Sequence, residues 1–238
     1  MKNVFIQLSL IILPVLSFAQ FDYSFDLISS MDYTFVNNSF TSNSTNVSVK
    51  PKYNYRFGGN FNVKVYDNIY IKTGLRFAQV GFTNKREELR WPGEFGPNGF
   101  KPDPSLPRYL HSTIDQSYFE IPIIFRYEFD GKKLSFYLET GISPHIYSRT
   151  RYITKSNIDT TKRFSYDTQF GGKRLLMCYV FGIGLNYNFD NLYQFFFQPT
   201  IRIYVSNDNQ FQFENAFRSI GIELGFRRGF SFEKVNKS

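Results

Sequence analysis

Bulky apolar residues alternate with small or polar residues along most of the chain, and a period of two is the pattern of a β-strand with two different faces. Every second residue from Phe119 to Phe129 is Phe, Ile or Tyr, whereas Glu120, Arg126 and Glu128 lie on the opposite face. The segment 175–189 alternates in the same way, with glycine and asparagine prominent on its other face. Segments of about ten residues or more are long enough to cross a bilayer as tilted strands.

The pattern predicts eight such strands, joined by connections that alternate between short and long. The strands are expected at residues 22–36, 51–66, 69–84, 113–129, 134–152, 172–189, 192–206 and 214–230. The short connections are hairpin turns rich in Asp, Asn and Gly, at 67–68, 130–133 and 190–191. Longer polar segments lie at 37–50, 85–112 and 153–171, with a shorter one near 207–213. This layout predicts an all-β fold, an eight-stranded antiparallel up-and-down transmembrane β-barrel with short periplasmic turns and longer extracellular loops.

Volume decides which face of the strands points outward. An eight-stranded barrel encloses just enough space for side chains, so it cannot hold the Phe, Tyr, Ile and Leu of every strand. The other face carries small residues and charges of both signs, which fit a narrow polar lumen. The expected lumen network consists of Asp26, Asp32, Arg56, Lys64, Lys72, Arg76, Glu120, Arg126, Glu128, Glu139, Arg202, Glu223 and Arg227. Because an unpaired buried charge is costly, we expect these residues to pair with one another and to plug the barrel.

Three prolines fall inside predicted strands: Pro122, Pro144 and Pro199. Proline cannot donate to a strand ladder and usually marks an edge or a bulge. A closed barrel has no edges, so bulges or unpaired donors are expected at these positions.

The first residues predict export from the cytoplasm. Lys2 precedes an apolar run from Val4 to Leu16, and Ser17-Phe18-Ala19 is the small-x-small pattern of a signal peptidase site. We therefore expect a signal peptide at 1–19, cleaved after Ala19, and a barrel domain at 20–238. No later run of 18 apolar residues could form a transmembrane helix. The single cysteine, Cys178, excludes an internal disulfide and is expected to pack within a strand.

Composition and charge narrow the candidate partners. Aromatic residues make up 20% of the chain and the formal net charge is +8, and no cofactor motif or metal-ligand spacing is present. The signal peptide argues against nucleic acid as the partner of the basic residues. Contact with lipopolysaccharide phosphates and a merely solvated loop surface are equally compatible with the sequence. The candidate contact residues are Lys85, Arg86, Arg149, Arg151, Lys173 and Arg174.

The chain resembles the PorT-type outer-membrane β-barrel family common in Bacteroidota. The resemblance covers roughly 21–230 and is carried by Tyr118-Phe119-Glu120-Ile121-Pro122-Ile123, Arg126-Tyr127-Glu128-Phe129, Tyr179-Val180-Phe181-Gly182-Ile183-Gly184-Leu185 and Ile220-Gly221-Ile222-Glu223-Leu224-Gly225-Phe226. It implies an integral outer-membrane protein, some relatives of which are linked to protein export, and it supplies no catalytic residues. The tail from Ser231 to Ser238 departs from the pattern, because it continues past the last barrel aromatic, Phe230.

Catalysis requires a general base, and the chain has only two histidines. His111 is expected in the long second loop, and His145 on the inner face of the fifth strand beside Ser143. His111 lies next to Ser112 and near Asp115, but neither histidine has a nucleophile and an acid at a spacing that the chemistry requires. Ser143 and His145 also lack an orienting carboxylate at the same height, so no catalytic, cofactor or metal site is expected. The favoured function is therefore a non-enzymatic outer-membrane scaffold or interaction partner in envelope assembly, protein export or surface contact. The alternatives are a lipid A hydrolase or acyltransferase and a secreted lipocalin-like barrel, which would need its bulky face inward.

Overall fold

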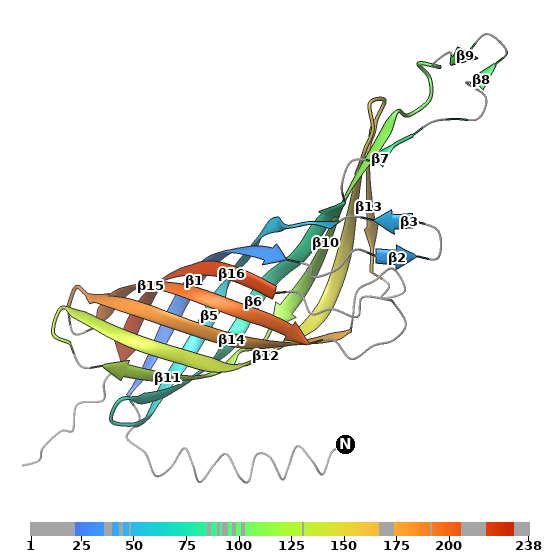
Figure 1. Ribbon diagram of the computed structural model, residues 1–238. Helices are drawn as coiled ribbons and strands as arrows, with labels where there is room; N and C mark the ends of the chain where they lie inside the picture. Colours follow the sequence, from blue (N-terminus) through green and yellow to red (C-terminus); the bar gives the residue numbers. More distant parts are fainter. Residues whose placement is uncertain are drawn as a thin grey trace, which may run out of the picture.

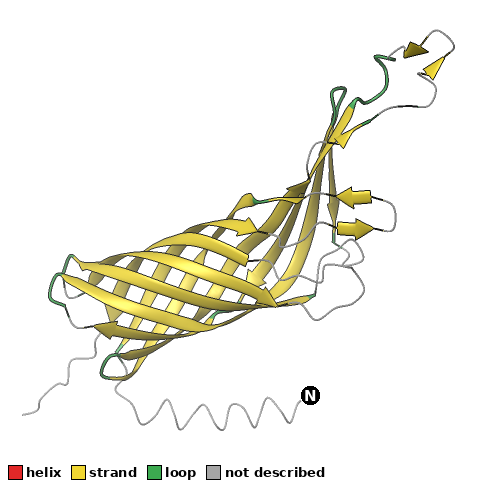
Figure 2. Ribbon diagram, in the orientation of Figure 1, coloured by secondary structure: helices red, strands yellow, loops and turns green. Residues whose placement is uncertain are grey.

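The computed structural model describes residues 22–35, 40–42, 45–47, 49–84, 87–89, 91, 95–96, 99–100, 103–129, 131–166, 174–190, 192–205 and 218–230. The predicted signal peptide at 1–19 and the tail after Phe230 lie outside these residues. Among the described residues, no helix is long and apolar enough to cross a bilayer. Strands, turns and loops make up the whole described fold (Figure 2).

Eight antiparallel strand positions form a closed barrel (Figure 1). In order around the ring they are β1 (Tyr23–Phe35), β5 (Lys52–Tyr66), β6 (Ile69–Asn84), the consecutive pair β10 (Tyr109–Glu120) and β11 (Ile123–Phe129), β12 (Leu134–Lys155), β14 (Leu175–Asn188), β15 (Tyr193–Val205) and β16 (Arg218–Phe230). The first and last strands close the ring in register from Tyr23↔Phe230 to Phe35↔Arg218. The predicted all-β, up-and-down barrel of eight strands is confirmed.

The two ends of the barrel differ, as the connection lengths predict. At one end, which we call the short-turn rim, short connections join β5 to β6, β11 to β12 and β14 to β15. Strand β1 begins at this rim with Tyr23, and strand β16 ends there with Phe230. Long connections leave the opposite end, the long-loop rim. In barrels of this type the short turns face the periplasm and the long loops face outward.

The long connections contain more strand than the sequence predicts. Short strands occur there at β2 (Phe40–Ser42), β3 (Thr45–Val47), β4 (Val49–Lys50), β7 (Glu87–Glu88), β8 (Phe95–Gly96), β9 (Gly99–Phe100) and β13 (Thr160–Ser165). Strands β10 and β12 continue past the barrel and, with β13, form a sheet that protrudes from the long-loop rim (Figure 1). The predicted loop position of His111 is therefore wrong: His111 lies in β10 and pairs with Lys155. The sequence did not predict these strands because it is mostly polar there, without the alternation of bulky apolar residues that marks the barrel strands.

None of the prolines moves the register, so the bulges expected at these positions are absent, whereas pairing is interrupted beside Pro122 and Pro199, as the alternative of unpaired donors implies. Pro122 separates β10 from β11, yet both strands keep one common register with β12 and with β6. Beside Pro199, the β14–β15 ladder lacks pairs at Ile183 and Gly184 and then resumes in the same register. Pro144 pairs with Met177 within a continuous ladder. The register shifts lie instead between Lys64 and Tyr66 and between Ser117 and Tyr118.

Bulky side chains cover the outside of the barrel. Ile123 is 42% exposed and its neighbour Ile124 is 1% exposed, as the alternation predicts. Aromatic rings gather towards the short-turn rim, where Tyr23 stacks on Phe230 with ring centroids 5.2 Å apart. Membrane proteins place aromatic girdles at this level, where the bilayer meets water.

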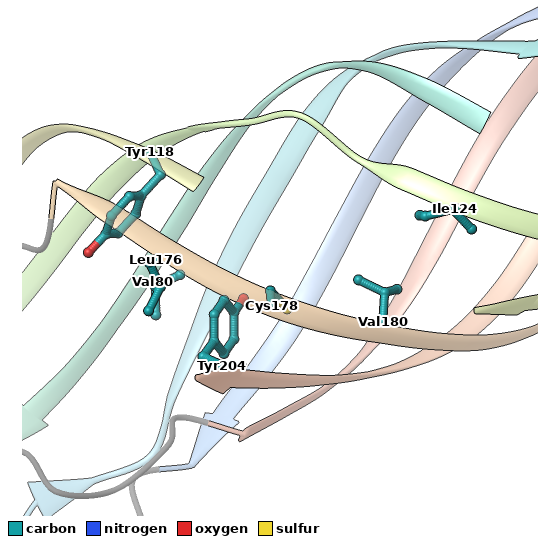
Figure 3. Packing of buried hydrophobic residues seen from close by; sticks show 7 residues of the cluster. All are labelled: Val80, Tyr118, Ile124, Leu176, Cys178, Val180 and Tyr204. Carbon is teal, nitrogen blue, oxygen red and sulfur yellow. The ribbon is translucent and has the colours of Figure 1, made fainter. Parts of the chain in front are cut away.

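The lumen is filled by side chains of two kinds. Near the long-loop rim, an apolar cluster closes the barrel with Val80, Tyr118, Ile124, Leu176, Cys178, Val180 and Tyr204 (Figure 3). Towards the short-turn rim, Ile28, Tyr137 and Phe196 form a second cluster. Tyr137 fits because Gly184 opposite has no side chain: a Cβ there would lie 2.0 Å from the tyrosine ring. Charged residues occupy the space between and around the clusters.

Candidate functional site

The charged residues of the lumen are drawn from seven of the eight strand positions of the barrel, which are all except β14. Eleven of the thirteen expected residues are buried, and Lys64 and Glu128 are half-buried towards the short-turn rim. Twelve of them form one connected set of ion pairs, consisting of Asp26, Asp32, Glu120, Glu128, Glu139, Glu223, Arg56, Lys72, Arg76, Arg126, Arg202 and Arg227. The six carboxylates balance the six cations. Within the described residues, Lys64 makes no ion pair.

Half of this set forms a closed ring of alternating charge, which we call the ionic ring. Its members are Glu120, Arg56, Asp32, Arg202, Glu223 and Arg76, from six different strands. Asp32 lies 2.9 Å from Arg56 Nη1 and 2.7 Å from Arg202 Nη1. Glu223 Oε2 lies 3.0 Å from Arg202 Nη2 and 3.3 Å from Arg76 Nη1. Glu120 closes the ring, with Oε2 against Arg56 Nε and Oε1 3.6 Å from Arg76 Nη1.

The remaining ion pairs continue from the ionic ring towards the short-turn rim. Lys72 Nζ lies 4.0 Å from Glu223 Oε1 and 2.5 Å from Glu139 Oε1. Glu139 also accepts from Arg126 Nε at 2.6 Å. The path then reaches Asp26, Arg227 and Glu128, the last at 3.8 Å from Arg227 Nη1.

Neutral polar and aromatic groups fix the orientation of this network. The Arg126 guanidinium lies 4.2 Å from the centroid of the Tyr137 ring, a cation–π contact. Tyr137 donates to Gln198 Oε1 at 3.0 Å, and Gln198 Nε2 donates to Glu139 at 2.8 Å. Near the long-loop rim, Arg56 Nη2 donates to the Tyr204 hydroxyl at 3.0 Å. Charges that are paired and hydrogen-bonded in this way can be buried, and these side chains fill much of the lumen.

One grouping resembles a nucleophile, base and acid, and the sequence analysis missed its carboxylate. The structure brings Glu120, from the neighbouring strand, to Ser143 and His145; Glu120 pairs with His145 across β10 and β12. However, the Ser143 hydroxyl donates to Glu120 Oε1 at 2.8 Å, and His145 Nδ1 lies 2.8 Å from the Ser143 carbonyl. An activated serine would donate to the imidazole instead. All three side chains are fully buried.

Metal-ligating side chains do not gather in the described part of the chain. No group of three or more His, Cys, Asp or Glu side chains there is arranged to hold a metal ion. The acids of the lumen are already occupied by arginine and lysine.

Three of the six candidate lipopolysaccharide contacts lie in the described part of the chain. Arg149 and Arg151 lie on β12, and Arg174 is exposed just before β14. Lys85, Arg86 and Lys173 lie outside the described residues. Arg151 Nη2 is 2.6 Å from Asp115, which Lys52 also contacts, so Arg151 is already paired within the chain. Arg149 is exposed, and its guanidinium lies 5.6 Å from the centroid of the Phe164 ring.

The protruding sheet, which we call the extension, is an ordered structure. It comprises the outer parts of β10 and β12, strand β13, their turn at 156–159 and the segment 103–108. Ser156 closes the turn, because its hydroxyl accepts from the backbone N–H of Asp159 at 3.0 Å. Arg108 N donates to Asn157 Oδ1 at 2.6 Å, which ties the segment 103–108 to that turn. In the same segment, Ser105 donates to the carboxylate of Asp103 and lowers the pKa of that group.

A family model for the outer membrane protein beta-barrel domain matches residues 18–206, which is most of the chain. The chain belongs to this family. Its location is therefore the outer membrane, and the bulky outer face of the barrel meets lipid. A search of curated proteins gives no match.

Solved structures of outer-membrane barrels are similar to this family member in fold at low sequence identity. Neisserial surface protein A has 11% identity and a TM-score of 0.44, over 89% of this chain and 98% of that one. OprG from Pseudomonas aeruginosa has 9% identity and a TM-score of 0.41, over 89% and 97%. The outer membrane protease OmpT from Escherichia coli has 9% identity and a TM-score of 0.40, over 88% and 96%.

Proposed function

We propose that this outer-membrane barrel is a non-enzymatic anchor that presents its extension to another component of the cell envelope or surface. The observation that carries the proposal is the extension itself, an ordered sheet beyond the lipid-facing band. The task served could be envelope assembly, protein export or surface contact. The resemblance to PorT-type barrels, some of which are linked to export, makes an export component one candidate partner.

The chemistry of the extension supports a binding role. Ile158, Phe164 and Tyr166 are 51%, 54% and 73% exposed, although they lie beyond the strands that lipid would cover. Exposed basic residues lie on the same two strands, among them Lys155 on β12 and Lys162 and Arg163 on β13. Apolar groups exposed to water within a polar rim are typical of protein interaction sites.

The plugged lumen supports an anchoring role over a transport role. An open pore requires a water-filled path, whereas here the balanced ion pairs and the apolar cluster of Figure 3 occupy the interior. A lipocalin-like function is disfavoured for the same reason, and because the bulky face of the barrel points outward.

An enzyme acting on lipid A is the alternative function, and the geometry gives it little support. Ser143, His145 and Glu120 are buried, and the serine hydroxyl is directed at the carboxylate. Lipopolysaccharide is better supported as a neighbour than as a substrate. Arg149 and Arg174 are exposed cations near the long-loop rim, where lipopolysaccharide phosphates could accept charge-assisted hydrogen bonds.

Site-specific cross-linking in intact cells tests the proposed function. With both Ile158 and Phe164 replaced by Ser, we expect the barrel to assemble normally while cross-linked envelope proteins fall several-fold in abundance. The matched control replaces Val65 and Tyr66, which are exposed apolar residues at the short-turn rim, with Ser. Equal capture by the two double variants would contradict the proposal.

A further inference from the structure

The outer wall of the barrel carries an apolar groove of about 1090 Å³ across β11, β12, β14 and β15. Its walls include Phe125, Leu138, Thr140, Phe181, Ile183 and Phe197. The missing β14–β15 pairs at Ile183 and Gly184 lie along it, beside Pro199. This volume is slightly above the range of about 300–1,000 Å³ that small-molecule sites occupy. Because the groove faces the bilayer, its natural occupant is an acyl chain.

Two adjacent lysines lie at the end of this groove. Lys132 and Lys133 are both exposed, in the turn that joins β11 to β12 at the short-turn rim. Phe136, which lines the groove, follows Lys133 by three residues, or about 10 Å of strand at about 3.3 Å per residue. The lysines are therefore at the level where the headgroup of a lipid lying in the groove would emerge.

The turn that carries the lysines is fixed against the groove. Asn188, at the end of β14, donates its backbone N–H to the Lys133 carbonyl at 2.9 Å and its side-chain amide to the Lys132 carbonyl at 3.0 Å. In the neighbouring turn, Asp190 Oδ1 accepts from the backbone N–H groups of Leu192 and Tyr193, both at 2.7 Å. That carboxylate oxygen is engaged with its own backbone, and among the described residues neither Lys132 nor Lys133 forms an ion pair with a carboxylate.

We propose that the groove and the lysine pair form a binding site for one phospholipid of the periplasmic leaflet. The acyl chains lie along the groove, and the phosphate accepts hydrogen bonds from Lys132 and Lys133. Lysine binds phosphate as a compact charge with three donors, and the interface gives the pair a partly desolvated setting. The site depends on the outer-membrane location and is independent of the proposed role of the extension.

Native mass spectrometry of the purified full chain with added phosphatidylglycerol tests the site. We expect one bound lipid per barrel, and weaker retention of a diacylglycerol that has the same chains but no phosphate. Lys132→Gln with Lys133→Gln should lower phosphatidylglycerol retention by about fivefold, the size expected for the loss of two exposed ion pairs. Thr140→Trp, which fills the groove, should lower the retention of both lipids.

Matched variants elsewhere on the barrel serve as controls. Lys50→Gln with Lys155→Gln removes two exposed charges from the long-loop end of the barrel, and Thr73→Trp adds the same bulk on the lipid face of β6. Both controls should retain lipid like the unaltered protein. Equal retention in the test and control variants, or of the two lipids, would overturn the proposal. A dimer that forms through the groove in place of lipid binding would overturn it as well.

Discussion

At the scale of single residues, the ionic ring limits which substitutions the interior of the barrel can tolerate. Each of its carboxylates contacts two arginines, and each arginine contacts two carboxylates. Such a network is not a large net source of stability, because desolvating the charges offsets much of their attraction. The loss of one member is nevertheless strongly destabilising, because its partners stay buried without a counter-charge. The ring therefore makes each of its six positions intolerant of neutral replacement.

Glu120→Gln tests this property. The change keeps the shape of the side chain but leaves Arg56 and Arg76 with one carboxylate each, so we expect a loss of about 3–5 kcal/mol in the free energy of unfolding. Urea unfolding of the barrel in lipid vesicles measures it. Asp67→Asn in the exposed β5–β6 turn is the control and should change stability little. A Glu120→Gln barrel as stable as this control would show that the ring is not closed.

At the scale of elements, the alternation of apolar and polar residues predicted the strands that lipid surrounds. It did not predict the strands that lie beyond the membrane. The segments predicted at 51–66 and 69–84 match β5 and β6 to within one residue. The extension escaped prediction because β13 is polar apart from Phe164, so its sequence lacks the period-two alternation of a lipid-facing strand. The proximity of Glu120 to Ser143 and His145 also escaped, because it depends on the register between β10 and β12, including the shift next to Ser117. Periodicity within one strand carries no information about that register.

The two faces of β11 give the element-scale prediction. Arginine at position 123 faces lipid and should cost about 2–4 kcal/mol near the bilayer midplane. Cysteine placed at 123 should react with a lipid-phase reagent, while cysteine at 124 should remain protected by the lumen. The background for both variants is Cys178→Ser, which removes the one native thiol. Equal labelling at the two positions would be incompatible with the barrel faces described above.

At the scale of the whole molecule, the protein is an outer-membrane barrel with a closed ring of strands and a lipid-facing exterior. Its two ends differ, because only the long-loop rim carries the extension. The sequence was sufficient for the strand count and for the charges that fill the interior, because both follow from period-two patterning and volume. It could not indicate how far β10 and β12 rise above the membrane, nor that the outer wall is hollowed between β11 and β15. Those features arise from the arrangement of several strands and from no single segment.

Surface staining of intact cells tests the central claim most directly. The same epitope tag is inserted in one variant at Asn157, in the β12–β13 turn of the extension, and in another at Gly131, in the β11–β12 turn. Both tags should stain after the outer membrane is permeabilised, which confirms that both variants are made and assembled. On intact cells the account predicts staining at Asn157 alone. Staining of intact cells at Gly131 would mean that the barrel is inverted or absent.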